Sequence, residues 1–139
     1  MQGEKGVLSY LKGDATQPIG NDKKMIVHIC NNSSHWGKGF VLALSKRWRE
    51  PEKQFKQLKT YTLGEIQIIQ VEANLEVVNM IAQNGIKKHY HPEGMRYVDY
   101  EALKTCLLKV GQYAGGKSVH ICPGLAWDLV VEVGLSLKA

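Results

Sequence analysis

The residues of this chain best suited to chemistry form one stretch, residues 28–39, which reads HICNNSSHWGKG. It combines histidines, amides and hydroxyls with a Gly-x-Gly pair, and it continues from an apolar run at residues 25–30. Apolar residues then recur at helical spacing in residues 40–48. A strand, a polar glycine loop and a helix in this order direct backbone N–H groups and the positive end of a helix toward an anion. The stretch favours a nucleotide-like ligand; the alternative is a tight connecting loop without a ligand.

A second string, GQYAGGKS at residues 111–118, matches the phosphate-loop pattern GxxxxGK[ST]. That loop needs a strand before it and a helix after it, so that the helix N-terminus faces the phosphates. Here the expected order is reversed, because a helical pattern precedes the string and a strand pattern begins at its end. We therefore interpret Gly111, Gly115 and Gly116 as residues that stop a helix and expect no phosphate loop.

Three further groupings carry weaker signals. His89, His91 and Glu93 could gather a metal, but two loop histidines without a fixed third ligand are more often solvated, so we expect no metal site. Ser33 or Ser34 lies near histidines, yet the chain has no GxSxG elbow, which argues against a serine hydrolase. His35 and Trp36 could stack on a base or ribose, or pack against the following helix.

Length and composition indicate one globular domain over residues 1–139, with 44% hydrophobic and 22% charged residues. No apolar run approaches the roughly 20 residues of a membrane span, and the N-terminus lacks the pattern of a signal peptide. The three cysteines lack metal-ligand spacing, so we expect reduced thiols and a cytoplasmic protein. The net charge of +5 favours acidic partners such as nucleotides or nucleic acid, although the lysines are scattered.

Strand and helix patterns alternate along the chain. We expect strands over residues 7–12, 25–30, 66–71, 76–82 and 118–122, and helices over 39–48, from Pro51 onward, over 97–114 and over 125–137. This alternation predicts an α/β sheet with helices on both faces. Ligands of such sheets bind beyond the carboxyl ends of the strands. Asp14, the loop at 31–39, the loop at 83–96 and the turn at 123–124 all follow expected strands and should converge there.

Several of these segments, taken together, resemble the macrodomain family. They are VLSYLKGDATQP at residues 7–18, IVHICNN at 26–32, WGKGFV at 36–41, LGE at 63–65, NMIAQ at 79–83 and RYVDYEAL at 96–103. The likeness is greatest to the branch of ADP-ribose-1″-phosphate phosphatases and terminal ADP-ribose glycohydrolases. The resemblance implies a three-layer α/β/α fold with a mixed central sheet and a cleft for ADP-ribose.

The resemblance also implies roles for individual residues. Asp14 matches the acid that accepts a hydrogen bond from the adenine amino group, as an acceptor-only carboxylate can. Asn31 matches the amide placed against the distal ribose, and the loops at residues 37–40 and 123–125 match those whose main chain surrounds the phosphates. The expected ligand contacts are Asp14, Ala15, Asn31, Ser33, Trp36, Gly37, Lys38, Gly39, Phe40, Pro123, Gly124 and Leu125.

The chain departs from its relatives at three places. The second phosphate loop is several residues shorter than the family pattern. The chain ends after an expected helix where relatives add a closing strand, which predicts a fold trimmed at the C-terminus. Gln83 stands where glycohydrolase-type relatives have a nucleophilic lysine, and an amide cannot form the covalent sugar adduct of an amine.

These observations predict a monomer that binds ADP-ribose or a derivative, without a cofactor. One alternative is a hydrolase of ADP-ribose-1″-phosphate, ADP-ribosyl esters or O-acetyl-ADP-ribose, in which Asn31 and His35, or His28, position a water. The second alternative is nonspecific binding of nucleic acid through the positive charge, which we rank last because the clustered basic and aromatic platform of such proteins is not evident.

Overall fold

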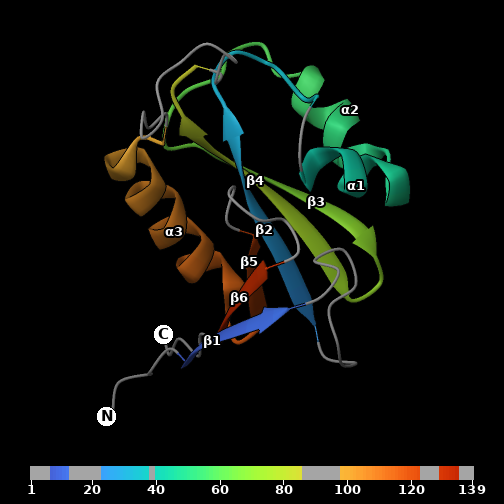
Figure 1. The fold of residues 1–139 in the computed structure, drawn as a ribbon, viewed down its shortest axis with the longest axis vertical. Helices are drawn as coiled ribbons and strands as arrows, with labels where there is room; N and C mark the ends of the chain where they lie inside the picture. The colour runs from blue at the N-terminus through green and yellow to red at the C-terminus, as the bar shows by residue number, and fades with distance from the viewer. Residues whose placement is uncertain (1–6, 13–22, 38–39, 86–97, 123–128, 135–139) are drawn as a thin grey trace.

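The computed structural model describes residues 7–12, 23–37, 40–85, 98–122 and 129–134. Their strands form one six-stranded sheet in the order β1-β6-β5-β2-β4-β3 (Figure 1). β2 runs parallel to β4 and β5, whereas the other neighbours are antiparallel, so the sheet is mixed. The strands are β1 (Val7–Lys12), β2 (Lys24–Asn31), β3 (Ile66–Glu72), β4 (Leu75–Gln83), β5 (Ser118–Cys122) and β6 (Leu129–Gly134).

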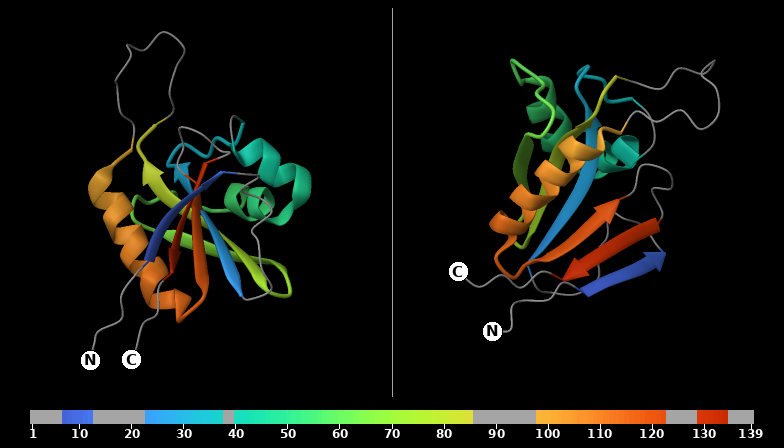
Figure 2. Two further views of the ribbon diagram at one scale, coloured as in Figure 1. Left: turned by 60° about the horizontal axis from the view of Figure 1, so that its bottom comes forward. Right: turned by 90° about the vertical axis from the view of Figure 1, so that its left-hand side faces the viewer.

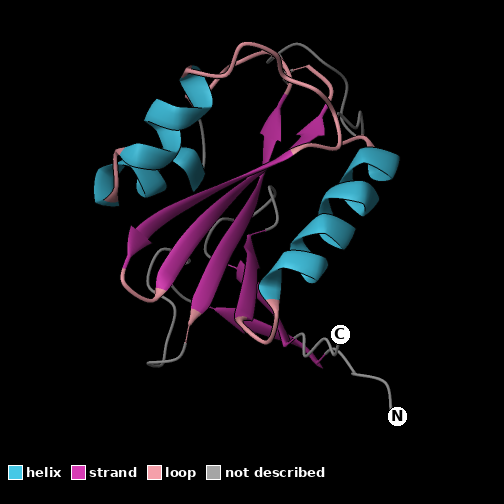
Figure 3. Ribbon diagram, turned by 180° about the vertical axis from the view of Figure 1, so that it is seen from behind, coloured by secondary structure: helices cyan, strands magenta, loops and turns pink. Residues whose placement is uncertain are grey.

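Helices cover both faces of the sheet, as Figures 1 and 3 show from opposite sides. α1 (Phe40–Arg47) and α2 (Glu50–Lys56) lie on one face and α3 (Tyr100–Ala114) lies on the other. Successive residues of β2 alternate between the two faces: Ile26 belongs to the core under α1 and α2, and Val27 to the core under α3. This two-sided burial confirms the predicted three-layer α/β/α arrangement, in which helices cover both faces of the sheet.

The ends of α3 follow from local chemistry. Asp99 precedes the helix in an extended conformation, and its side chain accepts a hydrogen bond of 2.9 Å from the Ala102 N–H. Gly115 (φ 55°) and Gly116 (φ 93°) adopt the left-handed conformation that ends a helix, and β5 follows. The interpretation of these two glycines as stop residues is confirmed. For Gly111 it is wrong, because that residue lies inside α3.

The C-terminal part of the sheet differs from the sequence prediction. Residues expected in a helix over 125–137 include β6, which pairs antiparallel with both β1 and β5 (Figure 2). The sequence LVVEVG explains this, since β-branched valines favour the strand over the helix. In the sheet, β6 lies between β1 and β5.

None of the helices in these described ranges is long and apolar enough to cross a membrane. Cys30 and Cys106 are buried free thiols. Burial raises the pKa of both thiols. Both cysteines are thus protonated at neutral pH and pack as small apolar side chains.

Candidate functional site

The carboxyl ends of β2 and β4 lie side by side at one edge of the sheet. The arrowheads of both strands point to the upper edge in Figure 1. Their parallel register pairs Cys30 with Ile81 and then shifts, so that Asn31 lies opposite Gln83. Such an irregularity redirects the chain as it leaves the sheet. The β2 loop (residues 32–37) and the β4 loop (residues 84–85) therefore begin next to each other, where ligands bind in sheets of this type.

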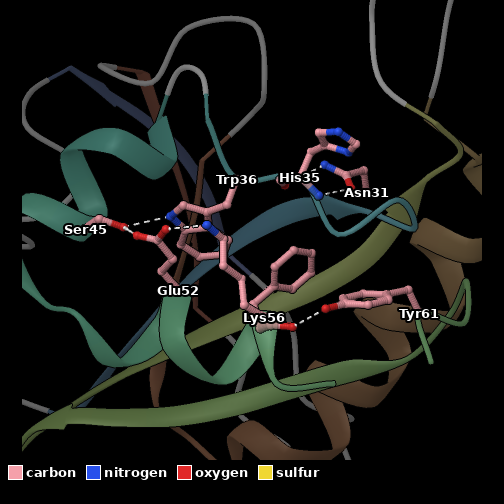
Figure 4. Close-up of polar contacts among 8 residues, drawn as sticks. Asn31, His35, Trp36, Ser45, Glu52, Lys56 and Tyr61 are labelled. Carbon is pink, nitrogen blue, oxygen red and sulfur yellow. Dashed lines mark hydrogen bonds and ion pairs between the residues drawn. The ribbon is translucent and has the colours of Figure 1, made fainter. Parts of the chain in front are cut away.

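Asn31 folds the β2 loop around its own side chain (Figure 4). Its Oδ1 accepts hydrogen bonds from the backbone N–H groups of Ser33 at 2.9 Å and His35 at 3.0 Å. Its Nδ2 donates to the carbonyl oxygen of His35 at 2.8 Å. The turn holds Ser34 at a φ of 60°. Both lone pairs of the amide oxygen are thus occupied, and among the described residues only one Nδ2 hydrogen has an acceptor.

Trp36 fixes the other end of the β2 loop to the helices. Its indole Nε1 donates to the Ser45 hydroxyl at 2.7 Å, and that hydroxyl donates to Glu52 at 2.8 Å. Lys56 forms an ion pair with Glu52 at 2.9 Å, which completes the series in Figure 4. The Trp36 ring packs against Phe55 with its centroid 5.3 Å away. With 7% of its surface exposed, Trp36 is a buried residue that packs against the helices, as the packing alternative expects.

His28 is a buried residue of the sheet, away from solvent. Its ring meets Trp36 and Phe40 at 5.4 and 5.5 Å, and its Nε2 is hydrogen-bonded to Asn79 Oδ1. Because that oxygen can only accept, the proton of the neutral ring sits on Nε2. Burial lowers the pKa of His28 to about 4, although the hydrogen bond to Asn79 raises it in part. His28 is thus neutral at pH 7 and is enclosed in the core, with 2% of its surface exposed.

The remaining predicted site residues divide into three groups. Gly37 and His35 are exposed, and a Cβ on Gly37 would meet nothing within 4 Å, so the surface above this glycine is open. Ser33 is half-buried beside them, and Phe40 opens α1 with its ring in the core. The others, together with the candidate metal ligands His89, His91 and Glu93, lie outside the described residues: Asp14, Ala15, Lys38, Gly39, Pro123, Gly124 and Leu125.

Comparison with solved structures decides the family. The chain is 41% identical to a macrodomain protein from Streptomyces coelicolor, with a TM-score of 0.69 and coverage of 79% of this chain and 74% of that chain.

The chain belongs to the macrodomain family.

Two solved structures from Bacteroides thetaiotaomicron are also similar to this macrodomain. One is 45% identical with a TM-score of 0.71, covering 79% of this chain and 74% of that one. The other, a protein of unknown function, is 43% identical with a TM-score of 0.75, covering 85% and 78%. A curated relative, chromodomain-helicase-DNA-binding protein 1-like from Danio rerio, is 34% identical over 70 residues; the match spans 47% of this chain and 7% of that relative. No family model matches the chain.

Gln83 of this macrodomain ends β4 and is used locally. Its Nε2 donates to the Gly85 carbonyl oxygen at 2.9 Å, and the side chain is half-buried. The amide therefore holds the β4 loop in shape.

Sequence reasoning missed the amides that connect the layers of the macrodomain. Asn79 is fully buried in β4; its Nδ2 donates to the Pro51 carbonyl oxygen at 3.2 Å and to Gln67 Oε1 at 3.0 Å. Gln67 in turn donates to the Gln54 carbonyl oxygen at 2.9 Å. These bonds attach β3 and β4 to α2 beneath the β2 loop. The signal was present in the sequence, because Asn79 is a lone amide within the apolar run of β4.

Proposed function

We propose that this macrodomain binds ADP-ribose or an ADP-ribose derivative at the carboxyl ends of its parallel strands. The observation that carries the proposal is the preformed β2 loop, which is fixed by Asn31 at one end and by Trp36 at the other. A loop already held in one shape loses little conformational freedom when a ligand binds. The macrodomain identity supplies the ligand class at the level of the family.

The β2 loop offers specific chemistry to such a ligand. The second Nδ2 hydrogen of Asn31 is a donor suited to a ribose hydroxyl, and the open surface at Gly37 lets a diphosphate or ribose approach the main chain. In the proposed complex Asp14 accepts from the adenine amino group at the other end of the ligand. The loops at residues 38–39 and 123–125 would supply N–H groups to the phosphates.

Binding is favoured over hydrolysis by the groups that the described residues present. The Asn31 oxygen is occupied twice, His28 is buried and neutral, and burial keeps the Cys30 thiol protonated. Within the described part of the site, His35 is the exposed ionisable side chain left to assist a water. If the protein is a hydrolase, we therefore expect His35 to be the residue that assists the attacking water.

Calorimetric titration with ADP-ribose, with AMP as the comparison ligand, tests the proposal. We expect micromolar affinity for ADP-ribose and much weaker binding of AMP, because AMP lacks the groups that would contact the β2 loop. Absence of ADP-ribose binding would refute the proposal. Affinity that falls steeply with salt and is equal for unrelated nucleotides would instead indicate general binding of nucleic acid.

An activity assay separates binding from hydrolysis. Phosphate release from ADP-ribose-1″-phosphate that is lost in His35→Ala, with ADP-ribose affinity unchanged, would establish an enzyme. Binding without turnover of this substrate, of ADP-ribosyl esters or of O-acetyl-ADP-ribose would establish a binding module.

A further inference from the structure

Two consecutive asparagines lie where β2 ends, and their side chains make different hydrogen bonds. Asn31 bonds to its own loop, whereas Asn32 bonds to the loop of the neighbouring strand. The Asn32 backbone N–H donates to the Gln83 carbonyl oxygen at 3.0 Å. Its side-chain Oδ1 accepts from the Gly85 N–H at 2.9 Å, and its Nδ2 donates to Asn84 Oδ1 at 3.2 Å. Asn32 therefore joins the β2 loop to the end of β4 by one hydrogen bond and to the β4 loop by two.

This junction extends the pairing of β2 with β4 past the point where the ladder ends. Backbone pairing of the two strands stops at Asn31 and Gln83. Beyond that point the Asn32 amide presents one acceptor and one donor, as a peptide group in a strand would. Gly85 meets it with a φ of 82°, a conformation that glycine adopts without steric cost. The side chain of Asn32 is only half-buried, so these bonds connect two surface segments.

We propose that Asn32 is a positioning residue of the ligand site, which holds the β2 loop at a fixed place relative to the β4 loop. This inference rests on the proposed function. Asn32 acts through Asn31 and the loop that Asn31 shapes, because its own amide is directed at Asn84 and Gly85. Without the Asn32 side chain, the Asn31 turn persists, but among the described contacts only the Asn32 backbone bond to Gln83 still holds this end of the β2 loop against β4. The part of a ligand bound over the β2 loop then loses its contacts, whereas a part bound elsewhere keeps them.

This gives a test that a purely structural role would not satisfy. Asn32→Ala should weaken ADP-ribose binding by about tenfold, the effect of losing two side-chain hydrogen bonds, and leave AMP affinity unchanged. Asn84→Ala should weaken it less, and the double variant should be no worse than Asn32→Ala, since both remove one connection. Asn74→Ala is the matched control, an exposed asparagine in the turn that begins β4 at the opposite edge of the sheet.

Equal loss of ADP-ribose and AMP affinity, or no loss of either, would overturn the positioning role while leaving ADP-ribose binding itself intact. Failure of the unmodified protein to bind ADP-ribose would refute the proposed function instead.

Amide hydrogen exchange without ligand tests the junction independently. Asn32→Ala should speed exchange at the Gly85 N–H and, on the other loop, at the His35 N–H; Asn74→Ala should change neither. Unchanged exchange at His35 would overturn the proposal whether or not the protein binds ADP-ribose.

Discussion

The indole of Trp36 and the hydroxyl of Ser45 share a hydrogen bond of 2.7 Å that attaches the β2 loop to α1. The Ser45 hydroxyl donates a hydrogen bond to Glu52 in α2, so one serine connects the loop to two helices. The Trp36 ring itself is buried in the same core as Phe40 and Phe55. The shape of the candidate site is thus set by packing in the core as well as by the loop itself.

Replacing Trp36 by phenylalanine keeps most of the ring and removes the donor. We expect the free energy of unfolding to fall by about 1–3 kcal/mol, which combines a lost hydrogen bond with a small packing defect. Urea denaturation measures the change. Ser45→Ala in the Trp36→Phe background should add less than it does alone, and strict additivity of the two changes would contradict the contact.

The buried His28 predicts a loss of stability in mild acid. Its pKa of about 4 in the folded protein lies below the value of 6.5 for an unperturbed histidine. The unfolded state therefore binds the proton first, and the contribution of His28 to stability falls as pH drops from 6.5 toward 4. Between pH 7 and pH 5 the loss should be about 2 kcal/mol.

The control for this pH effect is His28→Gln, which retains a donor for Asn79. The difference in free energy of unfolding between the unmodified protein and His28→Gln separates the effect of His28 from that of other groups that titrate in the same range. Urea denaturation of both at each pH gives the comparison, and parallel profiles would show that His28 does not cause the slope.

We expect Asp14 and Asn31 to act on different parts of ADP-ribose, Asp14 on the adenine and Asn31 on the part bound over the β2 loop. Asp14→Ala is expected to weaken both ADP-ribose and AMP binding by about 1–3 kcal/mol, the scale of a hydrogen bond to a charged group. Asn31→Ala should weaken ADP-ribose binding by a similar amount and spare AMP, because its amide shapes the β2 loop. Calorimetry with both ligands distinguishes them; the same AMP loss in both variants would place Asn31 at the adenine end.

The backbone of Ser34 is strained, and replacing this residue by glycine should relieve the strain. Its φ of 60° lies in the left-handed region, which costs roughly 1 kcal/mol for a residue with a Cβ. Ser34→Gly should raise the melting temperature slightly, and Ser34→Val should lower it, because a β-branched side chain fits this conformation worst. Thermal denaturation followed by circular dichroism provides the measurement. A higher melting temperature for the valine variant would exclude the strain.

Prediction from sequence succeeded where local pattern decides the structure. β1 and β5 have the predicted bounds, and α3 differs from its prediction at its first residues, where the Asp99 cap places the start at Tyr100. The C-terminal segment failed because its apolar residues fit helical spacing as well as a strand. Pairing with β1, more than a hundred residues earlier in the chain, decides between them.

The position of the candidate site in the chain could be predicted from the sequence, whereas most of its side-chain contacts could not. The residue types predicted where the β2 loop lies. The hydrogen bonds that each of its side chains makes depend on partners that are distant in the sequence. Asn31 and Asn32 are the same residue type at adjacent positions. Asn31 bonds within its own loop and Asn32 bonds to the β4 loop, a difference that the sequence does not reveal. Trp36 likewise depends on where α1 and α2 pack, which spacing along the chain does not determine.

The pairing of β1 has a consequence for how the protein is made. Among the described strands, β1 lies at the edge of the sheet beside β6 alone. Among the described strands a ribosome synthesises β1 first and β6 last, so β1 lacks this strand partner until β6 has emerged. The central strands and α3 can pack in the meantime, because β4 and β5 both pair with β2. Of the described strands, β1 is thus the first to be translated and the last to gain its partner.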